Sequence, residues 1–375
     1  MKRRSIILNV LIFIGIVSLF LAIYINQRGR NHFYSASDKR YHFTGRFDFS
    51  EEDAAKAWAP GAYVEFKFVG TYCDLVIEDE YRHFNKHNYI VVVLDNDKPK
   101  RIRLTDYYNQ IKIGKGLKKG VHTVRIVKAT ESYFGYIKLL GVWCKDLVKY
   151  KKSRKLLFEF IGDSITCGSG NDKETDDASG NAWSDLENAY VAFGPVLARR
   201  YNADWILSAV SGIGLTNSFT ESDKNMPEMY PRISLDEHAG AWDFKSQQKP
   251  DIIVITLGQN DGVQKEGKYI TAYKKFIVFL RNKFPKSTLI CSNSPMSQPK
   301  LRLHLNKCIR SMVSSLRKSG MKNIHAFYYK GRYNSGHTTH PSKSEHLKMV
   351  DELQEFFILR GWKTEKDLLA LRKKK

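Results

Sequence analysis

The sequence predicts a two-domain α/β protein with one N-terminal transmembrane helix. Three features predict this: an uncharged apolar run near the start, short strand-like runs up to Val148, and strands that alternate with helices after Lys155. We place a cytoplasmic tail and anchor at residues 1–30, a β-sandwich of the jelly-roll type at 31–148, and a three-layer αβα domain at 149–375. The length of 375 residues agrees with two folded domains of about 150 residues each.

The anchor prediction rests on an uncharged run from Ser5 to Ile25 that follows three basic residues. As an α-helix this run would be about 31 Å long, which is enough to cross the core of a bilayer. A cleaved signal peptide is the alternative, but its apolar region is usually shorter and ends at a small-residue cleavage site. No such site follows Ala22. We therefore expect an uncleaved single-pass anchor, with both domains on the non-cytoplasmic side of the membrane.

The segment from His32 to Val148 is composed of short alternating or apolar runs separated by turn residues. Strands at this spacing are typical of a β-sandwich or jelly roll. The runs are YHFTGRFDF, AYVEFKFVG, CDLVIED, YIVVVLDND, KRIRLT, GVHTVRIVKA and GYIKLLGVW.

After the basic linker Lys149 to Lys155 the pattern changes to apolar strands separated by amphipathic segments. The predicted strands are LLFEFIG, DWILSAV, DIIVITLG, STLICSN and NIHAFYY, and the predicted helices include AYVAFGPVLARRY, YITAYKKFIVFLRNKF and LRLHLNKCIRSMVSSLRKSG. Alternation of this kind indicates a mostly parallel sheet with helices on both faces. Ligands of such sheets bind outside the carboxyl ends of the strands.

Charge and cysteine content narrow the function classes. The formal net charge is +22, but the lysines are spread along the chain without the interleaved aromatic residues of a nucleic-acid module, so we expect no nucleic-acid partner. Such a surface favours anionic polymers or lipid headgroups. The five cysteines have no metal-type spacing and predict no disulfide framework. Nothing in the sequence indicates an oligomeric state.

The stretch FEFIGDSITCGSG, Phe158 to Gly170, places a serine at the end of a predicted strand. At that position the Ser164 hydroxyl would project into the ligand-binding crevice, where it could act as a nucleophile. The turn is not a Gly-x-Ser-x-Gly elbow, because Thr166 occupies the second glycine position. The alternative is a loop in which Asp163 and Ser164 bond their own backbone.

Two further strand ends carry groups that could stabilise an oxyanion. One predicted strand runs into Ser-Gly-Ile-Gly, which contains Gly212 and Gly214, and the next runs into Gly-Gln-Asn-Asp, which contains Asn260. Acyl transfer to a serine requires preorganised N–H donors about 2.7 to 3.1 Å from the oxyanion. The Ser164 amide, a glycine amide and the Asn260 side chain would provide three. Alternatively, glycine simply ends a strand and Asn260 caps the following helix.

A general base is available late in the chain, in YNSGHTTHPSKSEH. His340, which Pro341 follows, is the candidate to accept the Ser164 proton. His337 and His346 could instead bind zinc together with His340, but no cysteine or ordered acidic partner completes a site. We therefore expect no metal and no other cofactor.

Together these motifs resemble the four blocks of the SGNH, or GDSL-like, hydrolases: GDSIT, SGIG, GQND and HTTHPS in that order. The chain from about residue 40 to 360 resembles carbohydrate esterase family 2, in which a jelly roll precedes a flavodoxin-like SGNH domain. The resemblance implies deacetylation of sugars with Ser164 as nucleophile, His340 as base, and Gly212 and Asn260 joining the Ser164 amide as oxyanion donors. Gly214 is a substitute for Gly212, and Asp163 and His337 are supporting residues.

One position departs from the SGNH pattern: His337 stands where an aspartate usually precedes the histidine by three residues. The resemblance includes family members that use a Ser-His dyad oriented by a backbone carbonyl. We therefore expect a membrane-anchored carbohydrate O-acetyl esterase acting on an acetylated carbohydrate. A polysaccharide O-acetyltransferase that uses the same serine, and a catalytically inactive sugar-binding surface protein, are the alternatives.

Overall fold

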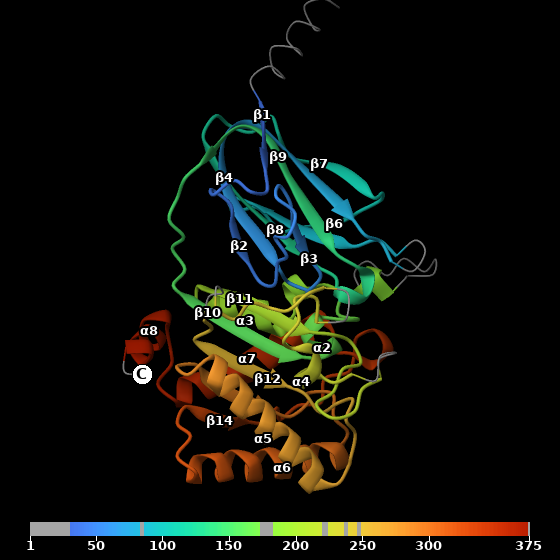
Figure 1. Ribbon diagram of the computed structural model, residues 1–375, viewed down its shortest axis with the longest axis vertical. Coiled ribbons are helices and arrows are strands. Elements are labelled where there is room, and N and C mark those ends of the chain that lie inside the picture. Colours follow the sequence, from blue (N-terminus) through green and yellow to red (C-terminus); the bar gives the residue numbers. More distant parts are fainter. Residues whose placement is uncertain are drawn as a thin grey trace, which may run out of the picture.

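The computed structural model describes residues 31–82, 86–172, 183–219, 224–235, 239–245 and 249–373. An antiparallel sheet domain, blue to green in Figure 1, lies against one side of a parallel-sheet domain that carries the remaining helices. The predicted anchor, Ser5 to Ile25, falls outside the described residues. Within those ranges, no helix is both long enough and apolar enough to cross a bilayer.

The N-terminal domain is a nine-stranded antiparallel sheet with the order β1-β9-β4-β8-β5-β6, in which β2 and β7 also pair with β4 and β3 pairs with β9. Its core is apolar and includes Phe66, Phe68 and Val142. The strands are β1 (His32–Ser35), β2 (His42–Thr44), β3 (Ala55–Ala57), β4 (Tyr63–Asp79), β5 (Tyr89–Leu94), β6 (Lys100–Arg103), β7 (Tyr108–Lys115), β8 (Val121–Lys128) and β9 (Ile137–Val148).

Two predictions for this domain were wrong in detail. The runs AYVEFKFVG and CDLVIED form one continuous strand, β4, whose pairing with β9 shifts between Val69 and Cys73. β9 pairs with β4 on both sides of Gly70 and Thr71, which keeps the chain extended there. The strands β1, β3 and β7 were not predicted, and the β7 segment YNQIKIGK is mostly polar. β-propensity depends on neighbouring strands more than on the segment itself.

The second domain contains five parallel strands in the order β11-β10-β12-β13-β14. Numbered within the domain this order is 2-1-3-4-5, which is that of flavodoxin-like sheets. The strands are β10 (Leu156–Gly162), β11 (Ala203–Ala209), β12 (Ile252–Thr256), β13 (Thr288–Ser292) and β14 (Ile324–Phe327). Four lie within the predicted apolar runs and β11 begins one residue before its run, because a strand buried on both faces has a continuous apolar sequence.

Helices cover both faces of this sheet (Figure 1). Along β12 the side chains alternate, so that Ile252 and Val254 pack on one face, and Ile253 and Ile255 on the other. The helices α3 (Phe193–Arg200) and α7 (Lys343–Leu359) lie on the first face, and α5 (Glu266–Lys283) and α6 (Pro299–Lys318) on the second. The shorter helices are α2 (Ser164–Cys167), α4 (Met226–Met229) and α8 (Glu365–Lys373), with 3-10 turns η1 (Ser132–Phe134), η3 (Trp183–Leu186), η4 (Ala189–Val191) and η5 (His337–Thr339).

The two domains share a buried interface along β11. The Tyr63 hydroxyl donates to the Asp204 carboxylate, and Trp205 Nε1 donates to the Gly61 carbonyl at 2.9 Å. The Arg46 guanidinium enters the second domain and donates to the Tyr230 carbonyl at 2.7 Å. Side chains from both domains pack into one apolar cluster, so the N-terminal domain covers part of the second domain's core.

Candidate active site

Ser164 lies where β10 ends, as the sequence predicts. Asp163 is the N-cap of α2, and its carboxylate accepts from the Ile165 N–H at 3.1 Å. This cap starts a helix immediately after the strand, so Ser164 is its first residue. Ser164 is 8% exposed, so it is largely buried but not closed off from solvent.

The loop that carries His340 is bound to the glycine-rich segment behind Ser164. The His337 N–H donates to the Gly170 carbonyl at 2.9 Å, and the Lys343 N–H donates to the Asn171 carbonyl at 3.1 Å. Gly170 has a φ of +68°, and a Cβ there would lie 2.7 Å from the His337 carbonyl oxygen. A glycine is therefore required for the two loops to approach each other.

This approach brings the predicted nucleophile and base together. His340 Nε2 lies 2.9 Å from Ser164 Oγ, within hydrogen-bond distance for proton transfer. Burial lowers the pKa of His340 below its ordinary value, while backbone groups of His337 and Thr338 oppose that shift. The neutral form, which can accept a proton, is thus favoured.

The other nitrogen of His340 faces a hydroxyl. Its Nδ1 lies 3.2 Å from Thr338 Oγ1, and that hydroxyl donates to the His337 carbonyl at 2.9 Å. Since the hydroxyl hydrogen is used, Thr338 Oγ1 accepts from Nδ1–H, which leaves Nε2 free to accept from Ser164. No carboxylate bonds to His340 within the described ranges. The centroid of the His337 ring lies 6.1 Å from that of the Trp183 ring.

Two backbone N–H groups beside Ser164 are available to an oxyanion. Among the described residues, nothing accepts from the N–H of Ser164 or of Gly212. Gly212 has a φ of +76°, which an L side chain rarely adopts and which sets the direction of its peptide. The predicted substitute, Gly214, differs, because its N–H already donates to Ser218 Oγ at 3.0 Å.

Asn260 lies at the end of β12 next to both loops. Its Nδ2 donates to the Ile213 carbonyl at 2.8 Å and lies 3.5 Å from the Asp163 carboxylate. One N–H is firmly engaged and the other has only a long contact, so it remains available to a substrate. Burial raises the pKa of Asp163 to about 7, which makes this contact sensitive to protonation near neutral pH.

The role of Asp261 was not predicted from the sequence. Its carboxylate accepts from the N–H groups of Leu215 at 2.8 Å and of Thr216 at 2.6 Å, together with the Thr216 hydroxyl. The end of β12 therefore fixes the loop after Gly212. Its place beside Asn260 in GQND was the only signal.

The three histidines of the late motif do not form a metal site. The His346 side chain is buried, and its Nδ1 accepts from the Phe193 N–H at 3.1 Å, away from His340. Within the described ranges the one group with metal-type donors is Glu131, Cys167 and Glu187, whose donor atoms lie within 4.8 Å of one another. Positive charge is already present there, since the buried Lys128 ammonium interacts with both glutamates.

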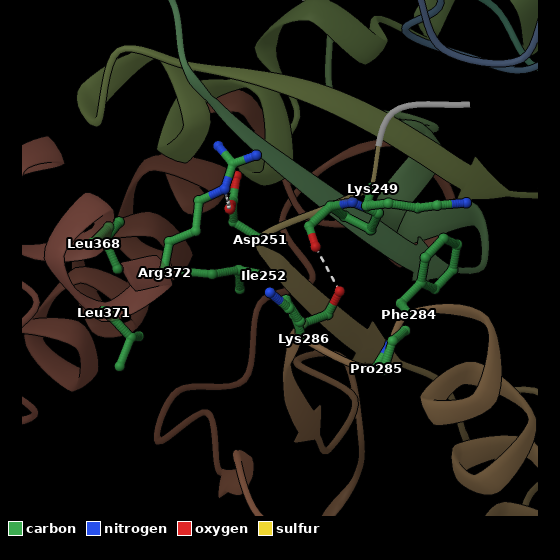
Figure 2. A pocket seen from close by; sticks show the side chains of 11 residues that line it. Lys249, Asp251, Ile252, Phe284, Pro285, Lys286, Leu368, Leu371 and Arg372 are labelled. Atoms are coloured by element: carbon green, nitrogen blue, oxygen red, sulfur yellow. Dashed lines mark hydrogen bonds and ion pairs between the residues drawn. The ribbon is translucent and has the colours of Figure 1, made fainter. Parts of the chain in front are cut away.

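Figure 2 shows a pocket away from this site. It is lined by residues such as Asp251, Phe284 and Arg372. Asp251 directly precedes β12, so the pocket lies at the amino ends of the strands, whereas Ser164 follows the carboxyl end of β10. Arg372 and Asp251 form an ion pair of 3.3 Å across it. The pocket has no part in the serine chemistry.

A serine and a histidine in contact at the carboxyl edge of a five-stranded parallel sheet define a serine hydrolase of the GDSL-like class. Residues 160–329 match the GDSL-like lipase/acylhydrolase family. Residues 43–151 match the carbohydrate esterase 2 N-terminal domain. The chain thus carries a carbohydrate esterase 2 N-terminal domain followed by a GDSL-like domain, as its sequence motifs suggest.

Relatives agree with this assignment. The chain is 28% identical to the cellulase/esterase CelE of Acetivibrio thermocellus over 320 residues, which is 83% of this chain and 38% of that protein. It is 28% identical to an acetylxylan esterase/glucomannan deacetylase of Cellvibrio japonicus, covering 76% of this chain and 80% of the relative. A solved family two carbohydrate esterase from Clostridium thermocellum, in complex with cellohexaose, has a TM-score of 0.77 and 27% identity, covering 86% of this chain and 99% of that structure.

Proposed function

We propose that the protein removes acetyl groups from acetylated polysaccharides through an acyl-enzyme on Ser164. The contact of 2.9 Å between Ser164 Oγ and His340 Nε2, beside two unengaged N–H groups, carries this proposal. Acetylated xylan and glucomannan are the substrate class, since the Cellvibrio japonicus relative is named for both.

In the first half-reaction, Ser164 Oγ attacks the acetyl carbonyl carbon while His340 Nε2 accepts the hydroxyl proton. The carbonyl oxygen becomes an oxyanion, and the N–H groups of Ser164 and Gly212 and the free N–H of Asn260 donate to it. Collapse of the intermediate breaks the ester C–O bond, and His340 returns the proton to the departing sugar oxygen. Water then attacks the acetyl-serine by the same steps and releases acetate.

Aromatic groups beside the site support a sugar substrate. The Trp183 ring lies 5.2 Å from the His340 ring. Phe219 is 82% exposed, and its N–H donates to the Gly212 carbonyl at 2.7 Å. Aromatic side chains offer apolar faces, on which sugar rings pack, next to the polar groups that fix orientation.

The test is acetate release from acetylated xylan and acetylated glucomannan, with Ser164→Ala as the matched variant. We expect release by the natural protein and none by the variant, with unchanged thermal unfolding. Retained release by Ser164→Ala would refute the acyl-enzyme. Adding unacetylated xylo-oligosaccharide and following it by mass spectrometry distinguishes hydrolysis from transfer, since a transferase would acetylate this acceptor.

We also propose that the N-terminal sheet domain is a jelly roll and that the Ser5 to Ile25 segment tethers both domains on the non-cytoplasmic side. The antiparallel strand order supports the first part, and the uncharged sequence supports the second. Protease treatment of intact cells that express the full chain with a C-terminal tag tests the topology. Protection of the tag, or a soluble tagged species that begins near residue 25, would refute the anchored arrangement.

A further inference from the structure

One buried carboxylate of the N-terminal domain extends into the candidate active site of the other domain. Glu131 follows the end of β8 and precedes η1, and it is 1% exposed. Its side chain does not cap η1, which it adjoins. Instead, its Oε2 accepts from the Ser211 N–H at 2.6 Å.

The partners of this carboxylate flank both backbone donors of the oxyanion site. Ser211 directly precedes Gly212. The Cys167 thiol, at the end of the helix that begins with Ser164, donates to the same Oε2 at 3.8 Å. The Ser211 and Ser169 hydroxyl oxygens are also 3.1 Å apart, which joins the two loops a second time. Glu131 therefore bridges the loop of Gly212 and the helix of Ser164.

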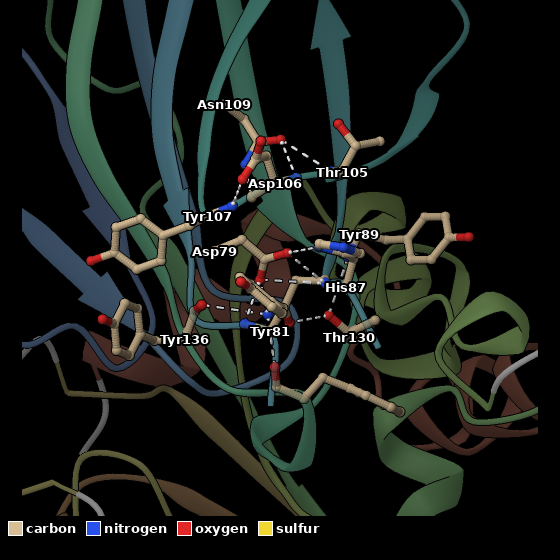
Figure 3. Close-up of polar contacts among 12 residues, drawn as sticks. Asp79, Tyr81, His87, Tyr89, Thr105, Asp106, Tyr107, Asn109, Thr130 and Tyr136 are labelled. Carbon is tan, nitrogen blue, oxygen red and sulfur yellow. Dashed lines mark hydrogen bonds and ion pairs between the residues drawn. The ribbon is translucent and has the colours of Figure 1, made fainter. Parts of the chain in front are cut away.

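A polar network fixes the turn that presents Glu131. Lys128 Nζ donates to Asn88 Oδ1 at 2.8 Å and to the Glu131 carbonyl at 3.0 Å. Thr130 Oγ1 donates to Asn88 Oδ1 at 2.6 Å, and Asn88 Nδ2 donates to Asp79 Oδ1 at 2.7 Å. Figure 3 shows Asp79 and Thr130 within this network at the base of the N-terminal domain. The turn therefore has little freedom to move.

Electrostatics make the contact costly to lose. Burial raises the pKa of Glu131, while its bond to Ser211 and the nearby Lys128 oppose the rise. Whether ionised or neutral, Oε2 accepts the Ser211 N–H. If the side chain were removed, the Ser211 N–H would lose its acceptor in a partly buried place, which destabilises the observed conformation of this segment.

We infer that Glu131 is a positioning residue for the oxyanion hole: it holds the Ser211–Gly212 segment so that the Gly212 N–H faces the developing oxyanion. The N-terminal domain then belongs to the catalytic apparatus of the second domain. The inference rests on the proposed acyl-enzyme mechanism. A Gly212 N–H that points elsewhere no longer stabilises the transition state, whereas binding of the ester in the ground state does not depend on it. The change should therefore lower kcat.

The test compares Glu131→Ala, Glu131→Gln and Tyr63→Phe in the full chain, with an aryl acetate as substrate. Glu131→Gln keeps a side-chain oxygen of the same reach. Tyr63→Phe is the matched control, because it removes another buried hydrogen bond between the domains, at the amino end of β11. We expect Glu131→Ala to lower kcat about 10- to 100-fold with little change in KM. The upper end of this range reaches the smallest effect expected for complete removal of one oxyanion donor. Glu131→Gln should restore most of this loss, and Tyr63→Phe should leave kcat unchanged.

A second measurement uses an arylboronic acid, which forms a tetrahedral adduct with an active serine. Its inhibition constant should rise in Glu131→Ala as kcat falls. If Glu131→Ala does not fold, Glu131→Asp serves instead, since it retains the carboxylate but withdraws it by one methylene. The inference would be overturned if Glu131→Ala, or Glu131→Asp in its place, kept the kcat of the natural protein. It would also be overturned if Glu131→Gln were as impaired as Glu131→Ala. Activity in Ser164→Ala would refute the mechanism itself, which is a separate result.

Discussion

The two halves of the candidate active site are held in different ways. The half that contains Ser164 and Gly212 is fixed by buried carboxylates, with Glu131 and Asp261 each accepting backbone N–H groups of the loop after β11. The half that contains His340 is held by backbone bonds and by the Thr338 hydroxyl, which is exposed.

This difference shows where the fold has placed its electrostatic support. Donors that are fixed before the reaction stabilise an oxyanion without reorganisation. In a Ser-His-Asp triad, the acid additionally stabilises the imidazolium that forms. Here the orienting group of His340 is a neutral hydroxyl, so the oxyanion half should contribute the larger share of transition-state stabilisation beyond the Ser-His pair itself.

The largest expected effect is that of His340→Ala. Without an acceptor for the Ser164 proton, kcat for an aryl acetate should fall at least about 10⁴-fold. Thermal unfolding should change little, because among the described residues the ring bonds to Ser164 and to its own loop alone. A variant that keeps a tenth of the natural kcat would show that another group is the base.

Asn260→Ala tests the oxyanion half and should lower kcat by about 10²- to 10³-fold. Asn217→Ala is a matched control, since the Asn217 side chain donates to the Asp261 carbonyl at 3.3 Å and, among the described residues, to no other group. Steady-state kinetics of both variants separate the roles. A loss confined to KM in Asn260→Ala would assign this residue to substrate binding instead.

The pH profile tests the histidine half. A general base works in its neutral form, and burial lowers the pKa of His340 below 6.5. We therefore expect kcat/KM to stay constant as the pH falls to that value. Below the lowered pKa it should fall about tenfold per pH unit. His337→Asp places a carboxylate in the loop and should move this limb to higher pH.

Asp163 also titrates near this range, because burial raises its pKa to about 7. The Asp163→Asn variant separates the two groups, since a limb that disappears in it belongs to Asp163. A limb above pH 6.5 that survives in Asp163→Asn would contradict a lowered pKa of His340.

Much of the site could be predicted because its main groups are short sequence motifs at strand ends. In parallel sheets, the carboxyl ends of the strands meet at one edge, so Ser164, Gly212 and Asn260 had to lie close together. Buried strands such as β10 are continuous apolar runs, so the positions of their ends can be predicted from the sequence. The structure places His340 Nε2 at 2.9 Å from Ser164 Oγ, which is the pairing that the motifs predict.

The contacts that hold these groups could not be predicted in the same way. Glu131 acts across a domain boundary, and its distance from Ser211 along the chain leaves no periodic signal. Thr338 has a φ of +47°, a conformation that its residue type does not suggest. Sequence analysis therefore drew attention to His337, the place of the missing acid, whereas Thr338 faces Nδ1.

Thr338→Val is the smallest expected effect and the sharpest test of how His340 is oriented. The change removes one neutral hydrogen bond, worth about 0.5 to 1.5 kcal/mol, so kcat should fall by about 2- to 10-fold. Thr339→Val is a matched control, because that neighbour is also exposed and has a positive φ of +63° but does not face the imidazole. His337→Ala should likewise have a modest effect, far below that of His340→Ala. A loss of about 10⁴-fold in Thr338→Val would mean that the hydroxyl carries the full role of a triad acid. Unchanged kcat would leave the backbone groups of His337 and Thr338 as the orienting partners of Nδ1, and the histidine half would then depend on main-chain atoms alone.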